Sequence, residues 1–154
     1  MLTVRDLMST SLFTLQKYDS IKSAKSIMKM ARIRHIPIVD EKSRFVGLIT
    51  HRDILSATVS KLAGIDRKTQ DELDAGIPAG GIMRKDAITV PPEMNLKEAA
   101  QILYRNKYGC LPVVEDGKLV GILTEADFLT LVISLLDAIE ASPEIGSHRP
   151  PTGL

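Results

Sequence analysis

The spacing of apolar residues changes several times along the chain, between a period typical of helices and one typical of strands. In the segment 21–32 the apolar residues lie three and four positions apart, which predicts an amphipathic helix, and Ser20 stands where its N-cap belongs. The short apolar runs 35–39 and 45–50 predict a β-hairpin. With a short strand expected at Leu12–Leu15 and a second helix after the hairpin, the predicted order is β-α-β-β-α.

The same order is written twice. The stretch GLITHRDIL at residues 47–55 returns as GILTEADFL at residues 121–129. Asn95 is the expected cap of the first helix in the second copy, and Glu98 three residues later completes a capping box. Asp116-Gly117 predicts a tight two-residue turn in the second hairpin. Repetition on this scale indicates two copies of one structural unit.

The two copies define the expected organisation of the chain. We expect a first repeat at residues 1–58, a partly helical connector at 59–80 and a second repeat at 81–141. Residues 142–154 are rich in Pro, Gly and Ser and are expected to form a disordered tail. The predicted fold class is α/β, in the α+β sense, with two β-α-β-β-α repeats.

The last predicted helix differs from the others because it is apolar nearly all round. It covers residues 126–141, ADFLTLVISLLDAIEA. A helix on a protein surface normally carries one apolar stripe, so this helix is expected to be covered on two sides. One cover is its own core. We assign the other to a second subunit, which predicts a homodimer formed partly through this helix.

Composition narrows the possible partners and compartment. The net charge of +1 and the few aromatic residues argue against a nucleic-acid partner. The N-terminus lacks the pattern of a signal peptide, and the most apolar stretch, 128–136, is too short to span a bilayer. The single cysteine, Cys110, cannot form an intrachain disulfide and is expected to be a half-buried structural thiol. We therefore expect a cytoplasmic protein with no membrane partner.

Thr and Asp recur at fixed positions of the repeated phrase, and two interpretations of them stay open. In the first, Thr-x-x-Asp is a capping box that opens a helix and needs no ligand. In the second, the helix N-terminus and the Thr hydroxyl bind a phosphate, while the carboxylate accepts hydrogen bonds from the two hydroxyls of a ribose. Phosphate and ribose receptors three residues apart would suit a nucleotide.

The doubled unit resembles a tandem pair of cystathionine-β-synthase (CBS) domains, a Bateman module, over residues 3–141. The motifs that carry the resemblance are VRDLM…FTL…HIPIVD…FVGLITHRDIL and AGGIM…ITV…CLPVVEDGKLVGILTEADFL. The resemblance implies two repeats packed sheet to sheet about a pseudo-twofold axis. It also implies two clefts between them that bind AMP, ADP, ATP or S-adenosylmethionine, and a dimeric assembly.

By position, the resemblance implies ligand contacts from both repeats. Asp53 and Asp127 would take ribose hydroxyls, and Thr50 and Thr124 would face phosphate. Thr14 and Thr89 would line the adenine pocket with main-chain groups near two aliphatic-Pro pairs. The complete expected set is Thr14, Arg34, His35, Ile36, Pro37, Thr50, Arg52, Asp53, Thr89, Leu111, Pro112, Thr124 and Asp127.

The two copies differ in charge where a phosphate would lie. The first carries Arg34, His35, His51 and Arg52 at positions where the second carries Gly109, Cys110, Glu125 and Ala126. A carboxylate beside a phosphate is repulsive. We therefore predict that the Asp53 cleft is the better phosphate binder, and that the Asp127 cleft is empty, weaker or suited to a less anionic ligand. Basic residues of one copy could also serve the cleft of the other.

The sequence contains no feature that indicates catalysis. It lacks a Gly-rich phosphate loop, a nucleophile elbow and metal-ligand spacing, so we predict no enzyme, no metal and no required cofactor. The expected function is a regulatory module that senses an adenosine-containing ligand and signals to an unidentified protein by a conformational change. The alternative is a ligand-free dimerisation module in which Thr-x-x-Asp is only a helix cap.

Overall fold

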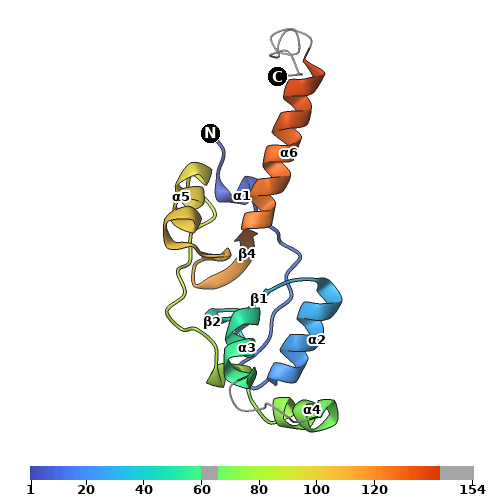
Figure 1. Ribbon diagram of the computed structural model, residues 1–154. Helices are drawn as coiled ribbons and strands as arrows, with labels where there is room; N and C mark the ends of the chain where they lie inside the picture. Colours follow the sequence, from blue (N-terminus) through green and yellow to red (C-terminus); the bar gives the residue numbers. More distant parts are fainter. Residues whose placement is uncertain (60–65, 143–154) are drawn as a thin grey trace, which may run out of the picture.

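A computed structural model of the protein describes residues 1–59 and 66–142 (Figure 1). The predicted connector therefore lies partly, and the predicted tail almost wholly, outside the described residues. In chain order the elements are α1 Val4–Leu7, α2 Ile21–Ala31, β1 His35–Val39, β2 Phe45–Thr50, α3 His51–Val59, α4 Arg67–Ala75, the 3-10 helix η1 Ala79–Gly81, α5 Leu96–Asn106, β3 Cys110–Glu115, β4 Lys118–Thr124 and α6 Glu125–Ala141. Helices combine with two small antiparallel sheets, which confirms the predicted fold class.

Each repeat contains the predicted hairpin. β1 pairs with β2 from His35 opposite Thr50, and β3 pairs with β4 from Cys110 opposite Thr124. At the second turn Asp116-Gly117 has φ angles of 53° and 80°, the left-handed values that a two-residue turn of this kind requires. The predicted strand bounds in the first repeat and the tight turn in the second are thus confirmed.

The strand predicted at Leu12–Leu15 is wrong for most of its length. Within it only Leu15 pairs, donating its N–H to the Pro37 carbonyl oxygen at 3.2 Å and accepting from the Val39 N–H at 2.9 Å. A longer parallel ladder would next require an N–H at Pro37 to pair with Phe13. Because proline has no N–H, the pairing stops after one bridge.

The predicted helix caps are present, but one capping box is not. Ser20 Oγ accepts from the Ser23 N–H at 3.2 Å, and Asn95 Oδ1 accepts from the Lys97 N–H at 2.8 Å. The Glu98 carboxylate does not return a bond to Asn95, contrary to the sequence prediction. The N-terminal segment instead lies against this helix start, where the Leu96 N–H donates to the Leu2 carbonyl oxygen at 2.9 Å.

The two hydrophobic cores interlock, because each is completed by the chain that precedes the other repeat. Val4, Leu7 and Met8, from the start of the chain, pack into the core formed by α5, β3, β4 and α6. Ala79 and Met83, from the segment before the second repeat, pack into the core formed by α2, β1, β2 and α3. Figure 1 shows this exchange, with α1 beside α6 and α5 rather than beside α2.

The same exchange is visible in the backbone hydrogen bonds. Ser9 pairs with Ile122 of β4 through two bonds of 2.9 and 3.0 Å, and Arg84 pairs with Leu48 of β2 through two bonds of 2.7 and 2.9 Å. Ser9 and Arg84 therefore hold equivalent positions in the two halves. The two matching bridges agree with the pseudo-twofold relation between the repeats that the resemblance implies.

Helix α6 leaves the core after its first turns. Phe128 and Leu131 pack against the second core. Figure 1 shows the helix continuing beyond the rest of its repeat. Along this projecting part the large apolar side chains are exposed, namely Leu129, Val132, Ile133, Leu135, Leu136 and Ile139. Its own core thus covers only the beginning of the helix.

Candidate functional site

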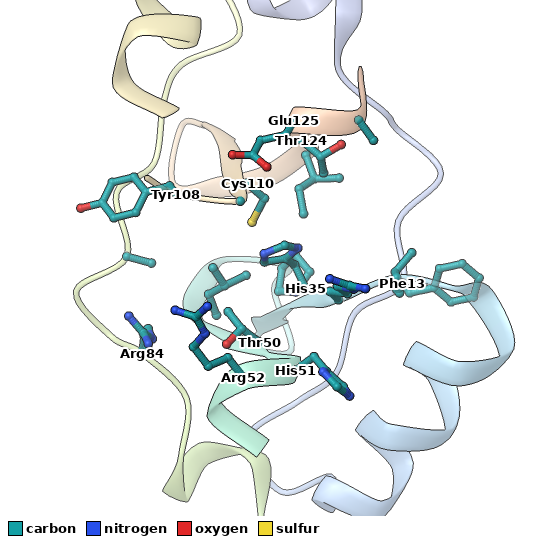
Figure 2. A pocket seen from close by; sticks show the side chains of 18 of the residues that line it. Phe13, His35, Thr50, His51, Arg52, Arg84, Tyr108, Cys110, Thr124 and Glu125 are labelled. Carbon is teal, nitrogen blue, oxygen red and sulfur yellow. The ribbon is translucent and has the colours of Figure 1, made fainter. Parts of the chain in front are cut away.

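A cavity of about 980 Å³ lies between the two repeats (Figure 2). In Figure 2, Thr124 and Glu125 approach it from the second repeat and Thr50, His51 and Arg52 from the first. Both Thr residues immediately precede a helix, α6 or α3, and so both helix N-termini face the cavity. The helix dipole makes such ends suitable for anions. The His51 and Glu125 N–H groups already donate to the carbonyl oxygens of Arg34 and Gly109, at 2.9 and 3.2 Å.

The structure brings only part of the predicted set to the cavity. The predicted residues that line it are Arg34, His35, Pro37, Thr50, Arg52, Thr124 and Asp127. The predicted residues that do not line it are Thr14, Ile36, Asp53, Thr89, Leu111 and Pro112. The side chains of Ile36 and Leu111 are fully buried in the two cores, so only their main-chain groups could reach a ligand.

The Thr-x-x-Asp pairs form reciprocal caps in both repeats. The Asp127 N–H donates to Thr124 Oγ1 at 3.3 Å, and the Thr124 N–H donates to Asp127 Oδ2 at 2.8 Å. The corresponding distances for Thr50 and Asp53 are 3.1 and 3.2 Å. The capping interpretation of the phrase is therefore satisfied by the chain itself, whether or not a ligand also binds.

The two carboxylates differ in what else they contact. Arg84 Nη2 lies 2.8 Å from Asp53 Oδ1, and Arg84 Nε donates to both oxygens of Asp53 at 3.0 and 3.2 Å. Burial by itself raises the pKa of Asp53, but the hydrogen bonds from Arg84 and Thr50 outweigh it and lower the pKa overall. Among the described residues, only Thr124 donates a hydrogen bond to the Asp127 carboxylate.

Basic side chains line the cavity from both repeats, most of them from the first. The cationic or titratable basic side chains that line the cavity are Arg32, Arg34, His35, His51, Arg52, Arg84 and Lys107, against the carboxylates Asp86, Glu125 and Asp127. A cavity with this excess of cations favours an anionic ligand. Which of the two clefts binds phosphate better stays a prediction.

His35 lies where the two repeats meet. Its Nε2 atom would be only 2.6 Å from a Cβ atom on Gly109, so the imidazole occupies the space left by that missing side chain. Burial lowers the pKa of His35, and Arg34 adds to this, while Glu125 and Asp53 act in the opposite direction. The ring therefore stays neutral at pH 7.

Cys110 is more buried than expected. Its residue is only 5% exposed, and burial raises the pKa of the thiol to about 12. The half-buried thiol predicted from the sequence is thus a buried, protonated one, although it also borders the cavity.

Comparison with known families decides what kind of repeat this is. The sequence profile of the CBS domain matches residues 4–60 and again residues 79–134. The chain belongs to the CBS domain family. The structure and the family assignment thus agree on two repeats per chain.

Related CBS proteins differ in how much of their length this chain covers. The CBS domain-containing protein YhcV of Bacillus subtilis is 31% identical over 149 residues, which are 97% of this chain and 98% of YhcV. The uncharacterized protein MJ1225 of Methanocaldococcus jannaschii is 30% identical over 129 residues, which are 84% of this chain but only 42% of MJ1225.

Solved CBS structures share the fold. AcuB of Vibrio cholerae superposes with a TM-score of 0.79 and 36% identity, over 91% of this chain and 98% of its own. CBSX2 in complex with AMP gives a TM-score of 0.74 and 26% identity, over 88% and 99%. The CBS pair of MJ0100, in complex with 5′-methylthioadenosine and S-adenosyl-L-methionine, gives 0.72 and 26%, over 88% and 98%.

Several residues that border the cavity of this CBS pair were not predicted. They include Phe13, Arg84, Lys107 and Tyr108. The repeat alignment contained a signal for Arg84, since Met83-Arg84 corresponds to Met8-Ser9 and so differs by one charge. It did not show that Arg84 would reach Asp53, because that contact depends on how the two CBS repeats interlock.

No helix within residues 1–59 and 66–142 is long and apolar enough to cross a membrane. Over the same described residues, no three His, Cys, Asp or Glu side chains gather in a group that could hold a metal ion.

Proposed function

We propose that this CBS pair is a cytoplasmic regulatory module, without catalytic activity of its own, that binds AMP, ADP, ATP or S-adenosylmethionine between its repeats. The observation that carries the proposal is the cavity onto which the N-termini of both α3 and α6 open, with Thr50 and Thr124 in its lining. The complexes of CBSX2 with AMP and of MJ0100 with S-adenosyl-L-methionine support this class of ligand.

The chemistry of the lining suits the parts of such a ligand. Thr hydroxyls and helix N-termini donate to phosphate oxygens, and Arg34 and Arg52, which are exposed, supply positive charge. Asp127 can accept hydrogen bonds from ribose hydroxyls. The adenine ring would take main-chain bonds near Thr14, Thr89 and the two aliphatic-Pro pairs, Ile36-Pro37 and Leu111-Pro112.

Signalling to a separate protein would work through the relative placement of the two repeats. The ligand would touch both repeats at once, since both line the cavity. It can shift their arrangement only if it binds one arrangement more tightly than another. The interlocked segments around Ser9 and Arg84 would transmit that shift, because each belongs to one half of the chain and pairs with the other.

Thermal unfolding with a panel of AMP, ADP, ATP, S-adenosylmethionine and NAD tests the proposal. A ligand at about 100 times its dissociation constant stabilises by roughly 2.7 kcal/mol, or about 5–10 °C for a domain of this size. Arg34→Ser and Arg52→Ser should reduce the shift for a phosphate-bearing ligand. Lys85→Ser, an exposed residue outside the cavity lining, is the matched control. The absence of a shift with every ligand would contradict the proposal.

We also propose that the module is a homodimer, formed partly through residues 126–141. Leu129, Ile133 and Leu136 follow helical spacing along the projecting part of α6 and are each at least half exposed, which favours an apolar partner surface. Leu129→Glu combined with Ile133→Glu should convert the dimer to a monomer in light scattering. Ser134→Glu, on the polar side of the helix, should not. An unchanged mass for the double variant would exclude this interface.

The alternative function is a ligand-free dimerisation module. It is favoured by the complete capping boxes, which account for Thr-x-x-Asp without any ligand. The same ligand panel separates the two functions. If no ligand changes the melting temperature while the α6 variants still dissociate the dimer, the scaffold is the better conclusion.

A further inference from the structure

We infer that Arg84 blocks the Asp53 carboxylate, one of the two positions at which a ribose could bind. The cavity then takes a single adenosine-containing ligand with its ribose at Asp127. This inference rests on the proposed function, whose ligand class it takes over. It departs from the sequence prediction, which favoured the Asp53 cleft for phosphate and expected the Asp127 cleft to be empty, weaker or suited to a less anionic ligand. In this inference Arg84 determines which of the two equivalent carboxylates, Asp53 or Asp127, can accept hydrogen bonds from a ribose. The repeat places Asp53 and Asp127 in equivalent positions, and likewise Arg84 and Ser9.

The Asp53 carboxylate is already hydrogen-bonded on both oxygens. Both of its oxygens accept hydrogen bonds from the Arg84 guanidinium, and Oδ2 also accepts from the Thr50 N–H. The Asp53 side chain is only 13% exposed and does not line the cavity. A ribose could hydrogen-bond to this carboxylate only by displacing a guanidinium that contacts both oxygens.

The Asp127 carboxylate has only the hydrogen bond of its own helix cap among the described residues. Asp127 lines the cavity, and its Oδ2 accepts from the Thr124 N–H at 2.8 Å. Within the described part of the chain, no residue donates to its Oδ1. The carboxylate is therefore held in place by its own helix cap while one oxygen stays available to a ribose hydroxyl.

The two carboxylates differ because different side chains stand at equivalent backbone positions beside them. Arg84 is held beside β2 by its two backbone bonds to Leu48, and Ser9 is held beside β4 by two equivalent bonds to Ile122. Met83 and Met8, the residues that precede them, fill the same space beside Gly47 and Gly121, each with Sδ 2.6 Å from the missing Cβ. The backbones match, so the long cation at position 84 and the short hydroxyl at position 9 make the difference.

The Arg84–Asp53 pair lies at the border of the cavity. The Arg84 side chain is 54% exposed and lines the cavity, whereas the Asp53 side chain is 13% exposed and does not line it. The guanidinium therefore stands between the cavity and the Asp53 carboxylate, whose charge it neutralises. Exchanging residues 9 and 84 should therefore move the open ribose position from one half of the pair to the other.

Isothermal titration tests this with AMP, S-adenosylmethionine and 5′-methylthioadenosine as probes. We expect one binding event per chain in the wild type and two in Arg84→Ser. Ser9→Arg should raise the dissociation constant by roughly 10- to 100-fold, as expected when hydrogen bonds to a charged carboxylate are lost. Asp127→Ala should weaken wild-type binding by a similar factor, and Asp53→Ala should not.

The exchanged double variant, Ser9→Arg with Arg84→Ser, is the sharpest control. It should again bind one ligand per chain, but binding should now be lost in Asp53→Ala and kept in Asp127→Ala. Its melting temperature without ligand shows whether it folds, and Lys85→Ser controls for loss of a neighbouring cation. Two sites in the wild type, or one unchanged site in Arg84→Ser, would overturn this inference alone. No binding of any probe to wild type or variants would overturn the proposed function as well.

Discussion

The sulfur atom of Met8 occupies the space in which a side chain on Gly121 would lie, 2.6 Å from the position of the missing Cβ. The two residues are 113 positions apart, and the contact joins the start of the chain to β4 of the second CBS repeat. Met83 and Gly47 repeat the arrangement in the other half. A side chain at either glycine would displace the methionine and would lie 3.1 Å from a backbone carbonyl oxygen, that of Ser9 or Arg84.

Gly121→Ala is therefore expected to destabilise the protein. The new methyl group would meet Met8 and would lie 3.1 Å from the Ser9 carbonyl oxygen, so the free energy of unfolding should fall by about 1–3 kcal/mol. Urea unfolding measures the loss. Gly81→Ala is the matched control, because the nearest atom to its new Cβ, Pro78 Cγ, is 3.8 Å away. Equal effects of the two substitutions would contradict this explanation.

Lys25 is expected to be important for holding α4 against α2. Its Nζ lies 2.7 Å from Oδ2 of Asp74, whose side chain is 1% exposed, and Gln70 Nε2 donates to the other oxygen at 2.7 Å. Lys25→Ala leaves this buried carboxylate without its cation, which should reduce the free energy of unfolding by about 1–3 kcal/mol.

A double-mutant cycle separates this contact from general effects on α2. Lys25→Ala together with Asp74→Ala should cost less than the sum of the two single changes. Lys22→Ala, an exposed residue on the same helix, should change stability by less than about 0.5 kcal/mol. Additive effects at positions 25 and 74 would show that the pair is not coupled.

Stability should fall in mildly acidic solution because of His35. Burial makes the folded state bind the His35 proton less readily than the unfolded state, so the pKa is lower in the folded protein. Stability is then complete above the unfolded pKa of about 6.5 and decreases as the pH falls through that value toward the lower folded pKa.

His35→Asn should flatten this part of the stability profile between pH 7 and 5, measured by urea unfolding at each pH. If the slope survives in His35→Asn, another group is responsible for the acid sensitivity.

Cys110 should be unreactive in the native protein. With its pKa raised to about 12 by burial, the thiol is protonated at pH 8 and is shielded from reagents. A disulfide reagent such as DTNB should label it slowly in buffer and rapidly in denaturant, reaching one equivalent because the chain has one cysteine. Rapid labelling of the folded protein would contradict the burial described above.

The elements that could be predicted are those set by neighbours in the sequence. The caps at Ser20 and Asn95 use a side chain and a backbone N–H two or three residues away. The Asp116-Gly117 turn requires left-handed backbone angles at adjacent positions. The repetition itself revealed two units, because each copy carries the same spacing of apolar residues and the same Thr-x-x-Asp.

The predictions that were wrong depended on contacts made elsewhere in the fold. The strand at Leu12–Leu15 had a suitable composition, but its partner strand contains Pro37 and offers no N–H at the place where a ladder would continue. The capping box at Glu98 had suitable spacing, but the N-terminal segment lies against that helix start.

The sequence by itself thus determined two similar α+β repeats, their helix ends and the helix-opening Thr-x-x-Asp pairs, because these follow from interactions over a few residues. Only the tertiary structure decided that each core is completed by the segment before the other repeat, and that Arg84 reaches Asp53 while Ser9 stands at the equivalent place beside β4. Arg84 and Asp53 are 31 positions apart, and their contact depends on how the two halves interlock. No local sequence pattern records that arrangement.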